Sequence, residues 1–168
     1  MREVSKNIDK FEVRQAYEGR SYCLRSSVSI ARPRAEVFEF FANANNLQEL
    51  TPDHLNFSII TPGPIEISEG SVIDYRLSLY GVSFGWQSEI TVWEPPYRFV
   101  DEQRKGPYKY WIHEHVFVED EGKTVVKDHL RYFPVGGALL NALFVRRDIG
   151  KIFNYRAQKL LQIFGSVE

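Results

Sequence analysis

Apolar and polar residues alternate along most of the chain, which is the pattern of half-buried β-strands. In the segment 20–31, Tyr22, Leu24, Val28 and Ile30 fall on one face and polar residues fall on the other. Six further segments are predicted as strands, with turn-forming residues between them: 55–60, 71–80, 83–93, 98–103, 108–118 and 124–133. About seven short strands, joined mostly by tight turns, favour an antiparallel sheet.

In two segments, the spacing of the apolar residues changes from that of a strand to that of a helix. Between the first two strands, Val37, Phe38 and Phe41 form a narrow apolar stripe, and two short helices are predicted there. From Leu139 to Phe164, apolar residues recur at helical spacing. A helix of about 25 residues is about 38 Å long, enough to cross a whole sheet. The predicted fold class is therefore α+β, with the helices packed on one face of the sheet.

The chain has 168 residues, a length that fits a single domain. Residues 1–19 are mixed and charged, with only weak alternation at Phe11 and Val13. This N-terminal arm is therefore left without a predicted structure. Residues 20–168 carry the strand and helix pattern, and they form the predicted domain.

Composition narrows the function classes. Twelve Phe, nine Tyr and three Trp make the chain rich in residues that form cores and ligand cavities. The balance of 21 basic and 22 acidic side chains argues against a nucleic-acid partner. No apolar run approaches the ~20 residues of a membrane span, and the N-terminus lacks the apolar region of a signal peptide. A cytoplasmic protein is expected. The sequence holds no glycine-rich phosphate loop, and no cofactor is expected.

Four segments carry a more specific signal. They are IARPRAEVFEFFANANNLQELTP (30–52), ITVWEPPYRFVDEQ (90–103), GPYKYWIHEHVF (106–117) and VVKDHLRYFPVGG (125–137). Together they resemble the START/Bet v 1-like superfamily, also called SRPBCC, and look closest to its bacterial polyketide cyclase/dehydrase-like branch. The resemblance implies the helix-grip fold, in which a curved antiparallel sheet wraps around a long C-terminal helix and a deep cavity. The superfamily is functionally diverse, so the resemblance alone defines no function.

Turn positions predict which side chains share a face of the sheet. With a two-residue turn at Glu121-Gly122, His115 lies opposite Asp128, and Glu114 lies opposite His129 on the other face. The inner face of this hairpin then carries Trp111, His113, His115, Phe117, Asp128, Leu130 and Tyr132. A turn one residue longer or shorter would turn one strand over relative to the other.

The remaining turns add residues to the same inner face. A type II′ turn at Gly81-Val82, a turn at Pro95-Pro96 and an odd-numbered loop around Gly106 are predicted. On this prediction Asp101 lies next to His113. The candidate ligand-binding residues of the resulting cavity are Tyr75, Trp86, Phe99, Asp101, Gln103, Trp111, His113, His115, Phe117, Asp128 and Tyr132.

His113 and His115 are the sharpest chemical feature, because residues two apart on a strand lie on one face, ~7 Å apart along the chain. Three interpretations stay open. The pair could bind a metal with Asp128 or Asp101 as third ligand, although the superfamily typically carries no metal there and none is expected. His115 and Asp128 could form a catalytic acid–base pair. The favoured interpretation is a ligand-orienting or structurally satisfied polar pair.

Ligand binding is the favoured function: a small hydrophobic or aromatic molecule, lipid- or polyketide-like, held between the sheet and the C-terminal helix. The first alternative is a cyclase- or dehydratase-like lyase that uses the His/Asp pair. The second is a protein-interaction or regulatory domain with a closed cavity. The segment GGALLNALF (136–144) is either a gate to the cavity or part of the core. A solvated basic face is predicted on the last helix, open to a peripheral or protein partner; it comprises Arg146, Arg147, Lys151, Arg156 and Lys159.

Overall fold

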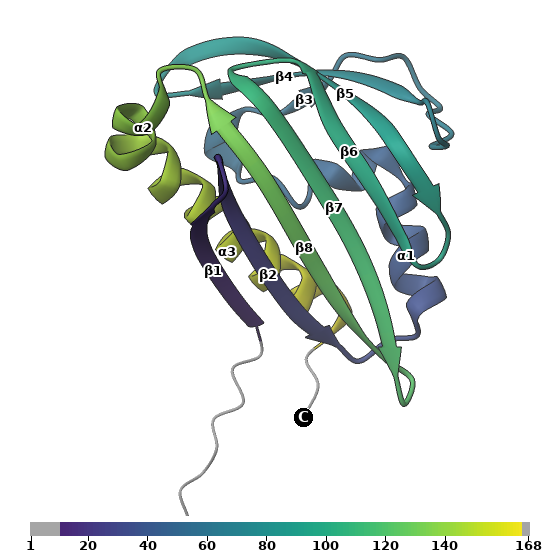
Figure 1. Cartoon of the computed structure of the whole chain (residues 1–168). Coiled ribbons are helices and arrows are strands. Elements are labelled where there is room, and N and C mark those ends of the chain that lie inside the picture. The colour runs from purple at the N-terminus through teal and green to yellow at the C-terminus, as the bar shows by residue number, and fades with distance from the viewer. Residues whose placement is uncertain (1–10, 166–168) are drawn as a thin grey trace, which may run out of the picture.

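The computed structural model describes residues 11–165 of the chain. Eight antiparallel strands form one sheet in the order β1-β2-β8-β7-β6-β5-β4-β3 (Figure 1). Their bounds are β1 Phe11–Glu18, β2 Ser21–Ile30, β3 Ser58–Ile59, β4 Val72–Leu79, β5 Val82–Glu94, β6 Arg98–Lys105, β7 Tyr108–Asp120 and β8 Lys123–Pro134. β2 follows β1 by a hairpin and pairs on its other side with β8, so the N-terminal hairpin lies beside the last strand of the sheet.

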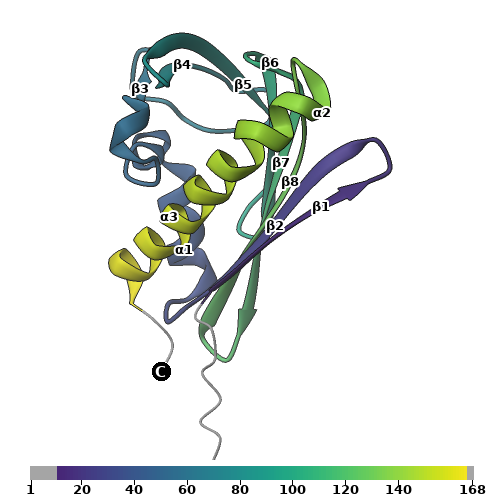
Figure 2. The same ribbon diagram turned by 90° about the vertical axis from the view of Figure 1, so that its left-hand side faces the viewer.

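The helical segments lie in two groups. Between β2 and β3 come α1 Arg34–Ala42 and the short 3₁₀ turns η1 Ala44–Leu47 and η2 Asp53–Leu55. After β8 come α2 Gly137–Leu140, the π-helical turn η3 Asn141–Val145 and the long helix α3 Arg146–Phe164. Figure 2 shows α3 crossing the concave side of the sheet, with β4 and β5 curving over it. The predicted α+β architecture is thereby confirmed, with helices gathered on one face.

Within residues 11–165 the sheet has eight strands, whereas about seven were predicted. The extra strand is β1, within the arm for which no structure was predicted, and it forms a hairpin with β2. As an edge strand, it buries little: Phe11, Val13 and Gln15 are half-buried and their neighbours are exposed. An edge strand with few buried positions leaves only a weak alternation in the sequence. Residues 1–10 of the arm lie outside the described residues.

The predicted register of the β7–β8 hairpin is confirmed. Asp120 pairs with Lys123, and the two turn residues have φ of 49° and 76°, as a type I′ turn requires. His115 therefore lies opposite Asp128. Asp101 lies opposite His113 across β6 and β7, as the odd-numbered loop predicted.

The turn between β4 and β5 differs from the prediction. Its central residues are Tyr80 and Gly81, with φ of 52° and 78°, and Leu79 pairs with Val82. This type I′ turn replaces the predicted type II′ turn at Gly81-Val82, because Tyr80 adopts the positive φ that the prediction assigned only to glycine. The pairing shifts by two residues. Since a shift of two keeps every side chain on its face, Tyr75 and Trp86 still point the same way.

Two apolar clusters fix the helices on the sheet. Phe38 and Phe41 of α1 pack edge-on against Phe117 of β7, with ring centroids 5.2 Å and 5.0 Å apart. Ile149 and Phe153 of α3 are buried together with Leu24, Leu130 and Tyr132 of the sheet. Each fully buried side chain of this size stabilises the fold by about 1.5–3 kcal/mol. Within residues 11–165, no helix is both long and apolar enough to span a membrane.

Candidate functional site

A cavity of about 370 Å³ lies between the curved sheet and α3. Its walls come mainly from α1, η1, β4, β5, β6, β7 and α3, and most of the lining side chains are aromatic or aliphatic. Cavities of roughly 300–1,000 Å³ with apolar walls and a few convergent polar groups are typical of small-molecule sites. Seven of the predicted ligand-binding residues line it: Tyr75, Trp86, Phe99, Asp101, Trp111, His113 and His115.

The other four predicted residues have different neighbours. Gln103 closes the β6–β7 hairpin, where its Nε2 donates to the carbonyl of Tyr108 at 2.7 Å. Phe117 lies in the core beneath α1. The hydroxyl of Tyr132 donates to Asn141 Oδ1 of η3 at 3.1 Å. Asp128 is 2 % exposed and contacts both histidines. An inward-facing position is common to core and cavity residues, so strand parity alone does not separate them.

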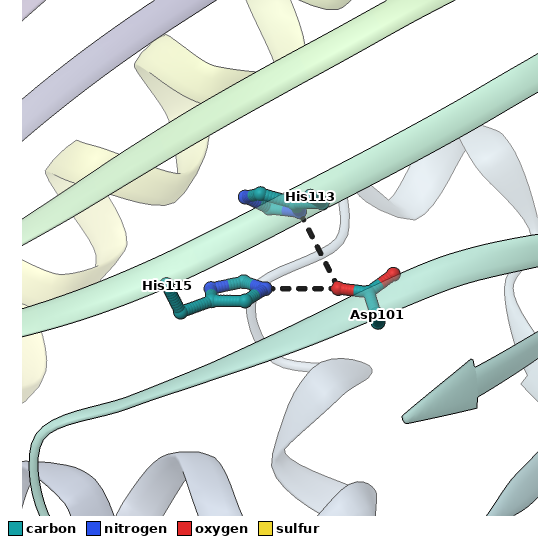
Figure 3. Close-up of side chains that lie close together, drawn as sticks. All are labelled: Asp101, His113 and His115. Atoms are coloured by element: carbon teal, nitrogen blue, oxygen red, sulfur yellow. Dashed lines mark hydrogen bonds and ion pairs between the residues drawn. The ribbon is translucent and has the colours of Figure 1, made fainter. Parts of the chain in front are cut away.

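Two histidines and one aspartate meet at the cavity surface. Figure 3 shows His113 and His115 projecting from β7 toward the carboxylate of Asp101 on β6. His115 Nε2 lies 2.9 Å from Asp101 Oδ2, and His113 Nδ1 lies 3.6 Å from the same oxygen. His113 and His115 are 6 % and 3 % exposed. The ring of Phe99 stacks on His115, with centroids 4.1 Å apart, and so restricts the rotation of this imidazole.

Asp128 holds both histidines from the opposite side. Its Oδ1 lies 2.9 Å from His113 Nε2 and 3.2 Å from His115 Nδ1. The sequence predicted a pair of His115 with Asp128, whereas the structure gives Asp128 to both rings and gives the shorter contact to His113. Ser26 of β2 donates its hydroxyl to Asp128 Oδ2 at 2.8 Å. Ser26 was missed, although its even position beside Leu24 already places it on the inner face.

Arg156 of α3 completes the cluster. Its guanidinium lies 3.2 Å from His115 Nδ1 and 3.7 Å from Asp128 Oδ1, and it sits over the ring of Phe41 at 5.1 Å. The residue is 7 % exposed. Its predicted place on a solvated basic face is therefore wrong. The burial of Arg156 could have been inferred from its spacing, because it follows Phe153 by three residues and thus falls on the buried stripe of the helix.

The rest of the predicted basic face remains outside the cluster. Arg146, Arg147 and Lys151 are exposed, and Lys159 is half-buried. Helical spacing explains the division: these four positions lie off the stripe formed by the buried residues of α3. Only the outward four are available to a partner in solvent.

The electrostatic environment sets the protonation states in the cluster. Burial lowers the pKa of His113 to about 4, with the neighbouring His115 adding to the effect, so this imidazole is neutral at pH 7. Burial acts to raise the pKa of Asp128, but the charge of Arg156 and the close contacts with both histidines outweigh it and hold that pKa well below its usual range. The pKa of Asp101 is also lowered, because the hydrogen bond from His115 and nearby positive charge outweigh burial. Both carboxylates are therefore ionised at neutral pH.

A second polar group lies on the aromatic wall of the cavity. The hydroxyl of Tyr75 is 2.7 Å from Ser88 Oγ, which also accepts a hydrogen bond from Trp86 Nε1 at 3.0 Å. Burial, with Asp101 nearby, raises the pKa of the Tyr75 hydroxyl, which stays neutral. These bonds satisfy the polar ends of both rings, and both residues line the cavity. This wall of the cavity thus combines a large apolar area with rings whose orientation is fixed by hydrogen bonds.

The fold defines a class of protein, the helix-grip proteins, in which a curved antiparallel sheet encloses a cavity beneath a long C-terminal helix. No protein-family model matches the chain, and a search of curated protein sequences gave no match.

Solved structures of low sequence identity share this fold. Protein Ms6760 from Mycobacterium smegmatis is 13 % identical with a TM-score of 0.65, covering 90 % of this chain and 97 % of its own. Major latex-like protein 151 from Panax ginseng is 12 % identical with a TM-score of 0.64, covering 87 % and 99 %. CalU16 from Micromonospora echinospora is 14 % identical with a TM-score of 0.56, covering 94 % and 84 %. At this identity, the likeness shows the fold alone.

Proposed function

We propose that this protein binds a small, largely apolar molecule in the cavity beneath α3. The observation that carries the proposal is the cavity itself: about 370 Å³ of space, walled by aromatic rings, with a charged cluster on one side. A filled core would have no need to keep Asp101, His113 and His115 at such a surface, because buried polar groups are costly unless they are fully paired.

The walls indicate the chemistry of the ligand. Trp86 and Trp111 meet edge to face, with centroids 5.2 Å apart, and Tyr75 stacks beside Trp86 at 6.0 Å. Such rings favour flat or aliphatic molecules, and the His113 and His115 side of the cavity favours a hydroxyl or carbonyl group. A lipid-like or polyketide-like metabolite has both features. The proposal therefore follows the polyketide cyclase/dehydrase-like branch suggested by the sequence, in a protein of the cytoplasm.

The start of the C-terminal helical region is the proposed entrance. Leu140 and Val145 line the cavity, while Leu143 and Phe144 are 57 % and 47 % exposed. The segment includes a π-helical turn, a form frequent at functional sites. Tyr80 contacts this segment through the ring of Phe144, and its hydroxyl donates to Asp148 Oδ2 at 2.6 Å. These contacts support the interpretation of residues 136–144 as a gate.

A variant that fills the cavity tests ligand binding. Ile152 faces the cavity from α3, and Gln158 is exposed on the same helix. We expect Ile152→Trp to reduce the affinity for the fluorescent apolar probe 1-anilinonaphthalene-8-sulfonate at least about tenfold, a loss of about 1.4 kcal/mol. Gln158→Trp adds the same ring outside the cavity and should bind the probe like the original protein.

Native mass spectrometry of the purified protein is the companion measurement, with a co-purifying small molecule as the expected result. Equal probe affinity in Ile152→Trp and Gln158→Trp, with no retained molecule, would contradict the proposal. It would favour a protein-interaction or regulatory domain, whose partner would meet the exposed basic side chains Arg146, Arg147 and Lys151.

A cyclase- or dehydratase-like reaction is the second candidate. It is favoured by one observation: His113 and His115 face the cavity while Asp128 orients both rings from behind. An imidazole oriented by a carboxylate suits proton transfer. The test is to incubate the molecule that mass spectrometry identifies with the protein and to follow loss of water by mass. His115→Gln should retain binding and lose turnover if this candidate holds.

A further inference from the structure

Three nitrogen and oxygen atoms on the cavity surface converge on one point. Asp101 Oδ2, His113 Nδ1 and His115 Nε2 all lie within 4.8 Å of one another. Two of the separations are 2.9 Å and 3.6 Å. Ligand atoms that surround a tetrahedral metal at about 2.0–2.1 Å lie about 3.4 Å apart. We propose that Asp101, His113 and His115 bind a first-row divalent metal ion, Zn²⁺ or Fe²⁺, at the cavity surface.

The far side of each imidazole supports this assignment. His113 Nε2 and His115 Nδ1, the nitrogens that point away from the site, both contact Asp128 Oδ1. A metal-bound histidine characteristically donates its other ring N–H to a carboxylate, which fixes the tautomer and the ring orientation. Here one carboxylate serves both rings. Asp128 is in turn oriented by the hydroxyl of Ser26 and the guanidinium of Arg156.

The tautomer of His115 distinguishes the metal-free and metal-bound arrangements. An arginine only donates hydrogen bonds, so its 3.2 Å contact with His115 Nδ1 leaves the proton on Nε2, which donates to Asp101. In the other tautomer, the Nδ1 proton points to Asp128 Oδ1 and the Nε2 lone pair points to the metal. Arg156 then keeps its ion pair with Asp128 Oδ1, 3.7 Å away. The change of tautomer moves the His115 proton from Nε2 to Nδ1 and breaks the contact of Arg156 with Nδ1. It needs no movement of the strands.

The ligand types and their access to the cavity also fit a cation. Two histidines and one carboxylate are a ligand set used by catalytic zinc and by mononuclear iron sites, and both leave positions open. All three ligands line the cavity, so an open position faces the space where a ligand would lie.

This inference replaces the sequence-based expectation of no metal. Sequence spacing showed two histidines on one face of a strand, but it gave no measure of how close Asp101 comes to them. The metal site does not depend on the proposed ligand, because the cation needs only the three side chains. Failure of one proposal therefore leaves the other standing, and probe binding to the metal-free protein separates them.

Metal titration of the full chain tests the proposal. Protein stripped with a chelator is titrated with Co²⁺, whose visible absorption reports coordination, and with Zn²⁺ and Fe²⁺ in competition. We expect one equivalent to bind, with Asp101→Asn reducing affinity at least about 100-fold, beyond the loss expected for a supporting residue. Asp128→Asn should cost about 10–100-fold. His129→Ala is the matched control, because it removes an imidazole from the outer face of the adjacent strand.

The outcomes are distinct. Substoichiometric binding, or equal affinity in the original protein, Asp101→Asn and His129→Ala, overturns the proposal. Circular dichroism confirms that Asp101→Asn, which keeps the shape of the side chain, is folded. If it is not folded, His115→Gln replaces it, with the same expected loss of Co²⁺ absorption. Elemental analysis of protein purified without chelator then distinguishes zinc from iron.

Discussion

The β7–β8 hairpin carries a histidine and a carboxylate opposite each other on both of its faces. On the inner face, His115 lies opposite Asp128, and on the outer face His129 lies opposite Glu114. The inner pair is 3 % and 2 % exposed, whereas the side chains of the outer pair are 44 % and 32 % exposed. The same residue types in the same register thus acquire different roles.

The difference comes from what covers each face. Over the inner face lie α1 and α3, which supply Phe41 and Arg156 and bury the inner pair. On the outer face, His129 Nδ1 and Glu114 Oε2 are 3.3 Å apart and partly exposed to solvent, where ionic contacts are weak. The environment of each histidine–carboxylate pair is therefore determined by whether helices cover that face of the hairpin, and not by the residue types of the pair. Three predictions test the contrast.

The largest effect is expected from Asp128→Ala. The substitution removes the acceptor of the hydrogen bonds from Ser26 and His113 and leaves the charge of Arg156 buried without its carboxylate. The free energy of unfolding should fall by about 3–5 kcal/mol, as for other broken buried ion pairs. Urea denaturation measures it. A loss no larger than the ~1 kcal/mol of an exposed pair would contradict the contrast between the faces.

A smaller effect is expected from Ser26→Ala, which leaves Asp128 Oδ2 without its hydroxyl donor. A buried acceptor that loses its partner costs about 1–3 kcal/mol. Ser27 is the matched control, since it is the next residue of β2 and lies on the opposite face. Ser27→Ala should change the free energy of unfolding by less than about 0.5 kcal/mol. Equal effects of the two substitutions in urea denaturation would argue against a coupled inner cluster.

The smallest effect is expected from Glu114→Ala on the outer face. This carboxylate accepts from Arg98 at 2.9 Å and contacts His129 at 3.3 Å, but all three groups reach solvent. The cost should stay below about 1 kcal/mol and shrink further in high salt, which screens exposed charges. Thermal unfolding at low and high salt measures both quantities. A larger, salt-independent loss would show that the outer pair resembles the inner one.

Turn counting predicted much of the site from sequence. It placed His115 opposite Asp128 and Asp101 opposite His113, because strand parity and turn length determine which residues meet. It did not predict which ring nitrogen contacts which carboxylate, since that depends on side-chain rotamers. It also missed Arg156, because the rotation of α3 about its own axis is set by packing against the sheet. The weakly patterned edge strand β1 was missed for the same kind of reason: its pairing with β2, rather than its own residues, makes it a strand.

The β4–β5 turn and the β7–β8 turn differ in how a change of register affects the site. The β4–β5 pairing sits two residues from its predicted register, and Tyr75 and Trp86 still face the cavity. At Glu121-Gly122, a slip of a single residue would carry Asp128 out to solvent and bring His129 under α3. That turn lies at the far end of both strands, yet its length decides which side chains of β8 face the cavity. A register change by an even number of residues keeps each side chain on its face, whereas an odd change moves it to the other face.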